Sequence, residues 1–264
     1  MGRDRGFLQW LVLVLILAFP AGHGMAQEKS GPAQDSVAED FVYGAPSDPS
    51  REWSLAAGGR IYDNWWDALD RKKPTTTHPS YPSAGKATGP GTWRCKECHG
   101  WDYAGRDGEY ATGSHYSGIR GIRAAEGRDP AAIMRSLRAP LHSYTPEMIT
   151  DEELRRVAAF VSEGQHDVQA LRDPKTGQPA GDINRGRAIY QTTCAACHGF
   201  DGKLLNWGTS EEPAYMGTDA NKFPWEVLHK IRNSHPGAAM ISLRALPLSE
   251  SAAVLAYART LPTK

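Results

Sequence analysis

The sequence has few cysteines, no net charge and no strand-like alternation of polar and apolar residues. Its 30 basic and 30 acidic residues balance, which argues against a strongly basic face and against nucleic acid as a partner. Hydrophobic residues make up 40%, and Gly and Pro are abundant, which indicates small, loop-rich domains whose cores need a non-protein component. The missing strand pattern predicts an all-α fold.

Long apolar segments are also scarce. The run at residues 7–19 has thirteen residues, fewer than the ~20 that span a bilayer. It follows two arginines in residues 2–5 and precedes small residues at Gly24 and Ala26. This order predicts a signal peptide over residues 1–26, a periplasmic protein, and no permanent membrane span after cleavage. An uncleaved anchor is the less favoured alternative, and the lack of a cysteine after the run argues against a lipoprotein.

All four cysteines belong to two copies of one pattern. Residues 95–102 read CKECHGWD, and residues 194–201 read CAACHGFD. Upstream of each copy, AGGRIYDNWW (residues 57–66) resembles NRGRAIYQTT (residues 184–193). Both segments are predicted to form the first helix of a small domain, so the chain contains an internal repeat.

The two halves also end alike. In residues 150–161, Thr150 and Glu153 have the spacing of a capping box at the start of a helix. Residues 249–258 are predicted to form the corresponding helix, with Ser249 as its N-cap. Each half therefore runs from an initial helix, through the cysteine pattern, to a terminal helix.

Composition divides the rest of the chain. Residues 27–50 are rich in Pro, Ser and Gly and are predicted to be a mobile N-terminal segment. A first domain is predicted over residues 51–171, with a surface insertion at about residues 72–91. Residues 172–182 are predicted to be a linker, and residues 183–264 a second domain.

The pattern C-x-x-C-H points to one cofactor. Four-thiolate zinc sites use two pairs about 15–20 residues apart, a much shorter separation than here, and a thioredoxin-like pair needs a βαβ context. Two structural disulfides suit an exported protein but do not explain the histidine. Two thiols that add to the vinyl groups of haem, followed by a histidine that binds the iron, use all three residues. The pattern predicts two covalently attached haems c, at Cys95, Cys98 and His99 and at Cys194, Cys197 and His198.

These motifs carry a family resemblance. The second half, with GRAIYQTTCAACHGFDG and MISLRALPLSESAAVLAYARTLP, resembles class I cytochrome c domains over nearly its full length. The first half resembles them more loosely because of its insertion. The whole chain is similar to the diheme c-type cytochromes of bacterial periplasms, with two tandem cytochrome c-like domains. The resemblance implies electron transfer between redox partner proteins, with helices around each haem.

The second axial ligands differ between the halves. Met240 lies 42 residues after His198, where the family places a methionine ligand. The position 42 residues after His99 is Leu141, and its neighbour is His142. We therefore expect His/His ligation of the first haem and His/Met ligation of the second.

Two other residues compete with His142. Met148 lies 49 residues after His99, close to the helix cap at Thr150, and His115 lies only 16 residues after His99.

Because a thioether ligand raises the reduction potential, the first haem should have the lower potential. Electrons are then expected to move from the first haem to the second.

With both irons doubly ligated, neither offers a position to a substrate. The leading hypothesis is therefore an electron carrier and not an enzyme. The alternatives are a diheme oxidoreductase, peroxidase-like or acting on sulfur compounds, with the first haem as the reactive site, or the haem subunit of a larger dehydrogenase or respiratory complex. No third cysteine pattern is present, which argues against the thiosulfate-handling diheme enzymes that use a cysteine as an axial ligand.

Overall fold

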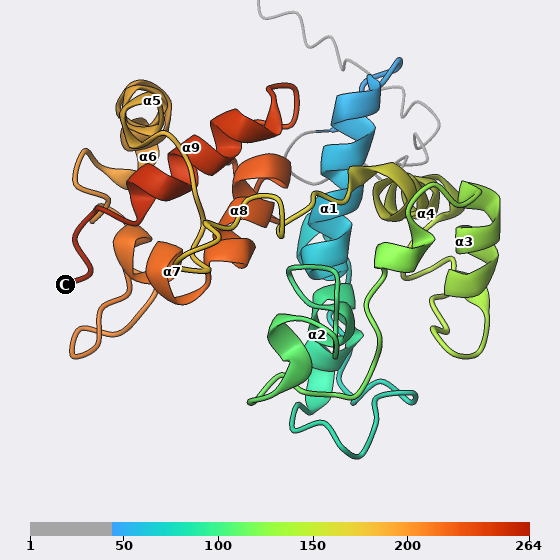
Figure 1. Ribbon diagram of the computed structural model, residues 1–264. Helices are drawn as coiled ribbons and strands as arrows, with labels where there is room; N and C mark the ends of the chain where they lie inside the picture. The colour runs from blue at the N-terminus through green and yellow to red at the C-terminus, as the bar shows by residue number, and fades with distance from the viewer. Residues whose placement is uncertain (1–43) are drawn as a thin grey trace, which may run out of the picture. The chain divides into compact units, whose positions relative to one another are not determined.

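The computed structural model describes residues 44–264, which consist of helices joined by loops (Figure 1). No β-strand occurs in this range, only isolated bridges between Gly105 and Arg120 and between Arg172 and Pro179. The predicted all-α class is confirmed for the described residues. The predicted signal peptide, and residues 27–43 of the predicted mobile segment, lie outside them.

The helices follow the predicted repeat. The first half contains α1 (Arg51–Ala68), α2 (Cys95–His99), α3 (Pro130–Arg138) and α4 (Asp151–Ala159), and α4 continues as the π-helical turn η4 (Phe160–Gly164). The second half contains α5 (Ile183–Ile189), the π-helical turn η5 (Tyr190–Cys194), α6 (Ala195–His198), α7 (Met216–Lys222), α8 (Pro224–Asn233) and α9 (Leu248–Ala258). Three 3₁₀ turns complete the set: η1 (Gly89–Trp93), η2 (Glu109–Ala111) and η3 (Arg123–Ala125).

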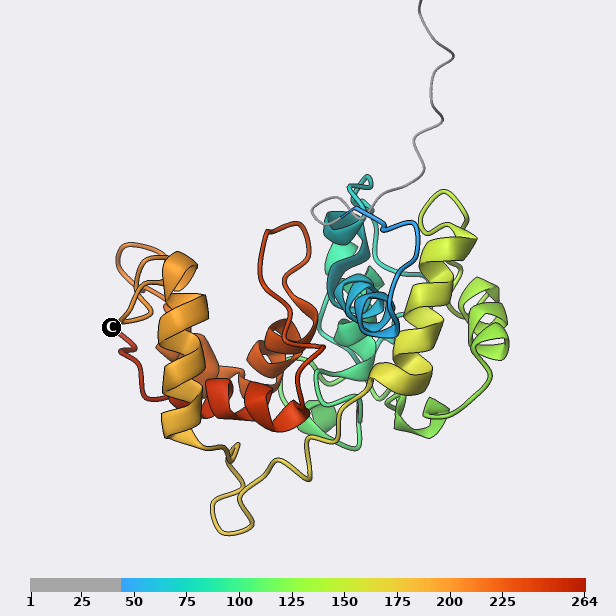
Figure 2. The same cartoon turned by 90° about the horizontal axis from the view of Figure 1, so that it is seen from above.

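Helix α1 packs between helices of both halves (Figure 2). Two adjacent glycines make this possible. A Cβ on Gly58 would lie 2.1 Å from the backbone oxygen of Arg156 in α4, and a Cβ on Gly59 would lie 2.3 Å from the side chain of Asn233 in α8. Real Cβ atoms do not approach so closely, so the glycines allow α4 and α8 to contact the same turn of α1.

The terminal helices begin in different ways. The predicted capping box of α4 is present: Glu153 N–H donates to Thr150 Oγ1 (3.3 Å), and Thr150 N–H donates to Glu153 Oε2 (2.8 Å). The prediction for α9 was wrong by two residues, because its N-cap is Pro247 and Ser249 lies inside the helix. Pro247 has no side-chain acceptor, and the Glu250 N–H donates to the Pro247 carbonyl instead (3.1 Å).

Two hydrophobic clusters form the core. The first is built on α1, α3 and α4, and the second on α8 and α9 with parts of α5 and α7. Trp101 and Tyr110, which follow the first cysteine motif, belong to the second cluster. The described residues form part of one compact unit, so the two tandem domains and their boundaries remain predictions.

A buried polar network joins the halves. His229 of α8 donates from Nε2 to the Gly59 carbonyl (2.9 Å), and its Nδ1 accepts from the Tyr103 hydroxyl (2.9 Å). Arg60 donates to the Asn233 carbonyl (3.0 Å). Because buried polar groups must be paired, these bonds fix how α1 and α8 fit together.

The segments predicted from composition are loops. Residues 72–91, the insertion, have no helix until η1 begins at Gly89. Most of the insertion is exposed or half-buried, as expected of a surface segment. His78 is buried, which the prediction of a surface insertion did not include. Residues 172–182 turn back on themselves before α5. Between residues 44 and 264, no helix is both long and apolar enough to cross a bilayer.

Candidate functional site

Each cysteine motif forms a single helical turn. Residues three apart in a helical turn lie on one face, so both thiols of each pair point the same way, beside the histidine that ends the turn. A glycine then stops each turn: Gly100 has a φ of +80° and Gly199 a φ of +81°, which are readily adopted only by glycine. The two turns carry Cys95, Cys98 and His99 in α2, and Cys194, Cys197 and His198 across the η5–α6 junction.

None of the four cysteines forms a disulfide. Burial raises the pKa of Cys95 to about 11, that of Cys98 to about 12 and that of Cys194 to about 11. Redox-active and zinc-binding cysteines instead need a lowered pKa, because they react and bind as thiolates. The surroundings of Cys95, Cys98 and Cys194 therefore favour neither a dithiol redox pair nor a zinc site.

In the first half, the structure places two imidazole rings near each other. The ring centroids of His99 and His142 are 6.3 Å apart, with an angle of 36° between the ring planes. His99 donates from Nδ1 to the Arg120 carbonyl (2.8 Å), and His142 donates from Nδ1 to the Ser136 carbonyl (3.0 Å). Each bond leaves Nε2 as the unprotonated nitrogen of its ring, the form that binds a metal.

The distance between these ring centroids and the neutral charge of the rings suit one metal ion bound between the two imidazoles. Metal–imidazole bonds of about 2 Å keep the centroids of two opposed rings on the order of 6 Å apart. Burial lowers the pKa of His99 to about 4 and also lowers the pKa values of His142 and His198. All three imidazoles are therefore neutral near pH 7, as ligation requires.

The two competitors of His142 have other partners. His115 donates from Nδ1 to Glu97 (3.1 Å), and its ring stacks on Tyr110 with centroids 4.8 Å apart. Met148 packs against the first hydrophobic cluster. Of the three candidates, His142 is the one that the structure brings into ring contact with His99.

Glu97 lies between the two cysteines of the first motif and is buried. Burial opposes its ionisation, but the hydrogen bond from His115 and the charge of Lys96, whose Nζ lies 2.9 Å away, outweigh burial. The pKa of Glu97 is lowered to about 2. A carboxyl whose pKa is lowered by folding stabilises the folded state above its unfolded pKa, and this contribution disappears as the pH falls towards its folded pKa.

We therefore expect Glu97→Gln to remove part of the acid sensitivity of the folded protein. Between pH 6 and pH 3, the wild type should lose about 2 kcal/mol more of its free energy of unfolding than the variant, since one pKa unit is about 1.4 kcal/mol. Urea unfolding at both pH values measures the difference. Glu126→Gln, at an exposed position, is the control and should behave like the wild type. If the wild type and Glu97→Gln lost the same free energy of unfolding between these pH values, the stabilising role of the Glu97 carboxylate would be contradicted.

In the second half, the motif opens into a cavity of about 590 Å³. Cys194, Cys197, His198 and Met240 all line it, so the structure brings the four predicted residues together. The ring centroids of Trp207 and His198 are 5.9 Å apart. A cavity of this size is in the range that cofactors occupy.

The loop after α8 holds Met240. Ser234 donates from Oγ to the Met240 carbonyl (2.6 Å), and the Met240 N–H donates to the Ala238 carbonyl (2.8 Å). His198 differs from His99, because its Nδ1 is buried without a hydrogen-bond acceptor among the described residues. The thiol pair, the neutral imidazole, the thioether and the cavity together fit a covalently attached haem.

The first half contributes a wall of this cavity. Asp63, Asn64 and Arg94 line it alongside residues of the second half. Helix α1 is interrupted at Asn64, whose φ of −155° and ψ of 95° are not helical. Next to this interruption, the Asp63 carbonyl accepts from Nε of Arg94 (2.7 Å), the residue before the first motif.

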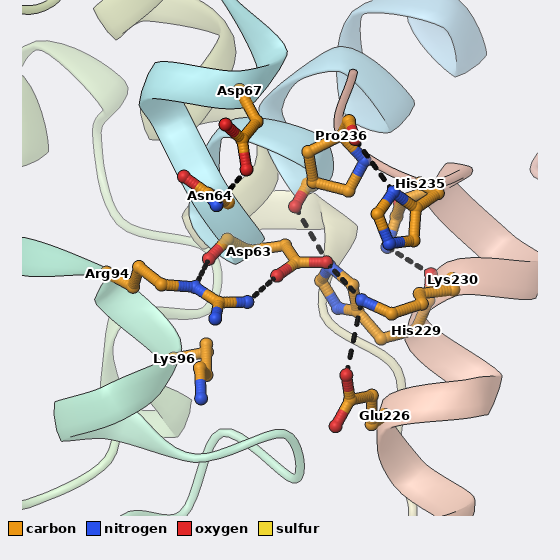
Figure 3. Close-up of polar contacts among 12 residues, drawn as sticks. Asp63, Asn64, Asp67, Arg94, Lys96, Glu226, His229, Lys230, His235 and Pro236 are labelled. Carbon is orange, nitrogen blue, oxygen red and sulfur yellow. Dashed lines mark hydrogen bonds and ion pairs between the residues drawn. The ribbon is translucent and has the colours of Figure 1, made fainter. Parts of the chain in front are cut away.

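The carboxylate of Asp63 lies between two cations (Figure 3). It pairs with the guanidinium of Arg94 and with Nζ of Lys230 (2.6 Å), which also contacts Glu226 (3.3 Å). The Asp63 side chain is only 1% exposed. Burial opposes its ionisation, but Lys230 and Arg94 outweigh burial and hold its pKa well below the usual range. Sequence analysis missed this ion cluster, because no local motif marks it.

One comparison with known families bears on this site. Residues 181–257 match the family model described as cytochrome c oxidase, cbb3-type, subunit III. The matched range contains the second cysteine motif, Met240, helices α5 to α8 and nearly all of α9. The second half is therefore a c-type cytochrome domain, and such domains carry covalently bound haem c and transfer electrons.

Proposed function

We propose that this chain is an exported, periplasmic electron-transfer protein with two covalently attached haems c. The first haem would be held by thioethers to Cys95 and Cys98, with His99 and His142 on its iron. The second would be held through Cys194, Cys197, His198 and Met240. Haem iron, once bound, accepts and releases one electron.

The pair of His99 and His142, with ring centroids 6.3 Å apart, carries the proposal. Both rings are anchored at Nδ1 to backbone carbonyls, so both Nε2 atoms are available without rearrangement. Two histidines that both bind the iron would leave it no coordination position for a substrate. This supports a carrier over a diheme oxidoreductase that reacts at the first haem. The imidazole in the place of a thioether also favours a lower potential at the first haem, and electron flow towards the second.

The matched family supports a second candidate. Its description names a subunit of a cytochrome oxidase, which favours a haem subunit of a larger respiratory complex as this candidate. The electron-transfer chemistry is the same in both cases, and only the permanence of the partner differs. Size-exclusion chromatography of a native periplasmic extract separates the two: a carrier elutes at its own mass, and a subunit elutes with its complex.

The proposal is tested on the oxidised protein purified from the periplasm. The intact mass should exceed that of the processed chain by two haems, and changing Cys194 and Cys197 to Ser should remove one of them. Low-temperature EPR should show two low-spin ferric signals, one typical of His/His and one of His/Met ligation. A single haem, or a high-spin signal from a five-coordinate iron, would rule out the two-haem carrier in this form.

A further inference from the structure

The insertion contains a buried histidine that contacts the proposed distal ligand of the first haem. His78 is 9% exposed, whereas most of its neighbours in the insertion are exposed or half-buried. Its Nε2 lies 2.9 Å from the backbone carbonyl of His142. This bond links a segment before the first cysteine motif to the loop that carries His142.

Hydrogen bonds fix the tautomer of His78. Its Nδ1 accepts from the backbone N–H of Ser80 (3.1 Å), so Nδ1 carries no proton. The ring proton is therefore on Nε2, which donates to the His142 carbonyl. A neutral ring with both nitrogens in use has one orientation that satisfies both bonds.

Three hydrogen bonds hold His142. Its backbone N–H donates to Ala139 (3.0 Å) and its Nδ1 donates to Ser136 (3.0 Å), both at the end of α3. The third is the bond from His78 to its carbonyl. The next residue, Ser143, has a φ of +54°, so the chain turns sharply just after this carbonyl. His78 thus holds this turn by a hydrogen bond that does not come from α3.

The insertion is itself anchored beside the first cysteine motif. The His78 N–H donates to Thr92 Oγ1 (2.8 Å), and the His78 ring packs on Trp93 with centroids 4.2 Å apart. Trp93 donates from its indole N–H to the Thr76 carbonyl (2.9 Å), and its carbonyl accepts from the Tyr144 hydroxyl (2.7 Å). The insertion therefore connects the haem-attachment turn to the loop of His142.

We propose that His78 is a positioning residue that holds His142 opposite His99, so that the first haem resists exogenous ligands. This inference rests on the proposed His/His ligation. The insertion then has a defined role, since its His78 donates to the backbone of the loop that carries His142. Without the Nε2 donor of His78, the His142 carbonyl loses this hydrogen bond. The loop then opens more often, and His142 leaves its position opposite His99 more often.

Cyanide binding to the oxidised holoprotein tests this inference. His78→Phe keeps a ring against Trp93 but removes both nitrogens, and His78→Gln restores a donor at the position of Nε2. Cyanide should bind the first haem about tenfold faster in His78→Phe, the factor that corresponds to one lost hydrogen bond. His78→Gln should bind at the wild-type rate, as should Ser83→Ala at an exposed position of the insertion.

EPR assigns each cyanide adduct, because binding at the first haem removes the His/His signal. Equal rates in the wild type, His78→Phe and His78→Gln would overturn the role of His78, as would a His78→Gln variant as fast as His78→Phe. If His78→Phe is not produced with both haems, His78→Met, which also lacks a donor, takes its place. A wild type without a His/His signal would instead refute the proposed ligation itself, so the two failures are distinguishable.

Discussion

Replacing Asp63 with alanine should cost about 3 kcal/mol of the free energy of unfolding. The variant leaves Arg94 and Lys230 close together in a buried place without the carboxylate that both contact. The side chains of these cations are only 24% and 17% exposed, so water compensates little for the lost charge. Urea unfolding of the holoprotein, followed by tryptophan fluorescence, measures the loss.

Two variants separate charge from other causes. Asp63→Asn keeps the volume and one acceptor oxygen, so it should lose a large part of the same stability if the charge is what matters. Glu163→Ala breaks an exposed ion pair with Arg51, whose side chains are 44% and 63% exposed, and should cost less than about 1 kcal/mol. Equal, small losses for Asp63→Ala and Glu163→Ala would show that the buried cluster does not hold the halves together.

Local patterns made part of the site predictable. The two cysteine turns, their terminating glycines and the capping box at Thr150 depend on residues within a few positions of one another. His142 was reached differently, by transferring the spacing between His198 and Met240 to the other half. The structure places His142 near His99, with ring centroids 6.3 Å apart, and its role as an iron ligand stays a prediction.

Contacts between distant segments were not predictable in this way. The ion pair of Asp63 with Lys230 joins residues 167 apart, and it depends on how α1 and α8 pack. His78 was assigned to a surface insertion because Pro, Ser, Thr and Gly dominate its surroundings, and composition does not reveal a single buried ring. Trp101 similarly follows the first motif but packs in the second hydrophobic cluster.

Exchanging the two distal ligands should reverse the order of the reduction potentials. His142→Met should raise the potential of the first haem, and Met240→His should lower that of the second, because a thioether favours ferrous iron more than an imidazole does. We expect shifts on the order of 0.1 V, a part of the ~0.8 V range that axial ligands cover. A spectroscopic redox titration, with EPR to identify each haem, measures both.

The double variant provides the sharpest test, because the electron should then rest on the first haem in half-reduced protein. Met148→Leu is the matched control and should shift neither potential, since Met148 packs against the first hydrophobic cluster. If methionine at position 142 does not reach the iron, His142→Ala decides the assignment: the first haem should become high-spin, whereas a residue outside the ligand set would leave it low-spin. An unchanged His/His signal in both His142 variants would exclude His142 as the ligand, and with it the proposed direction of electron flow.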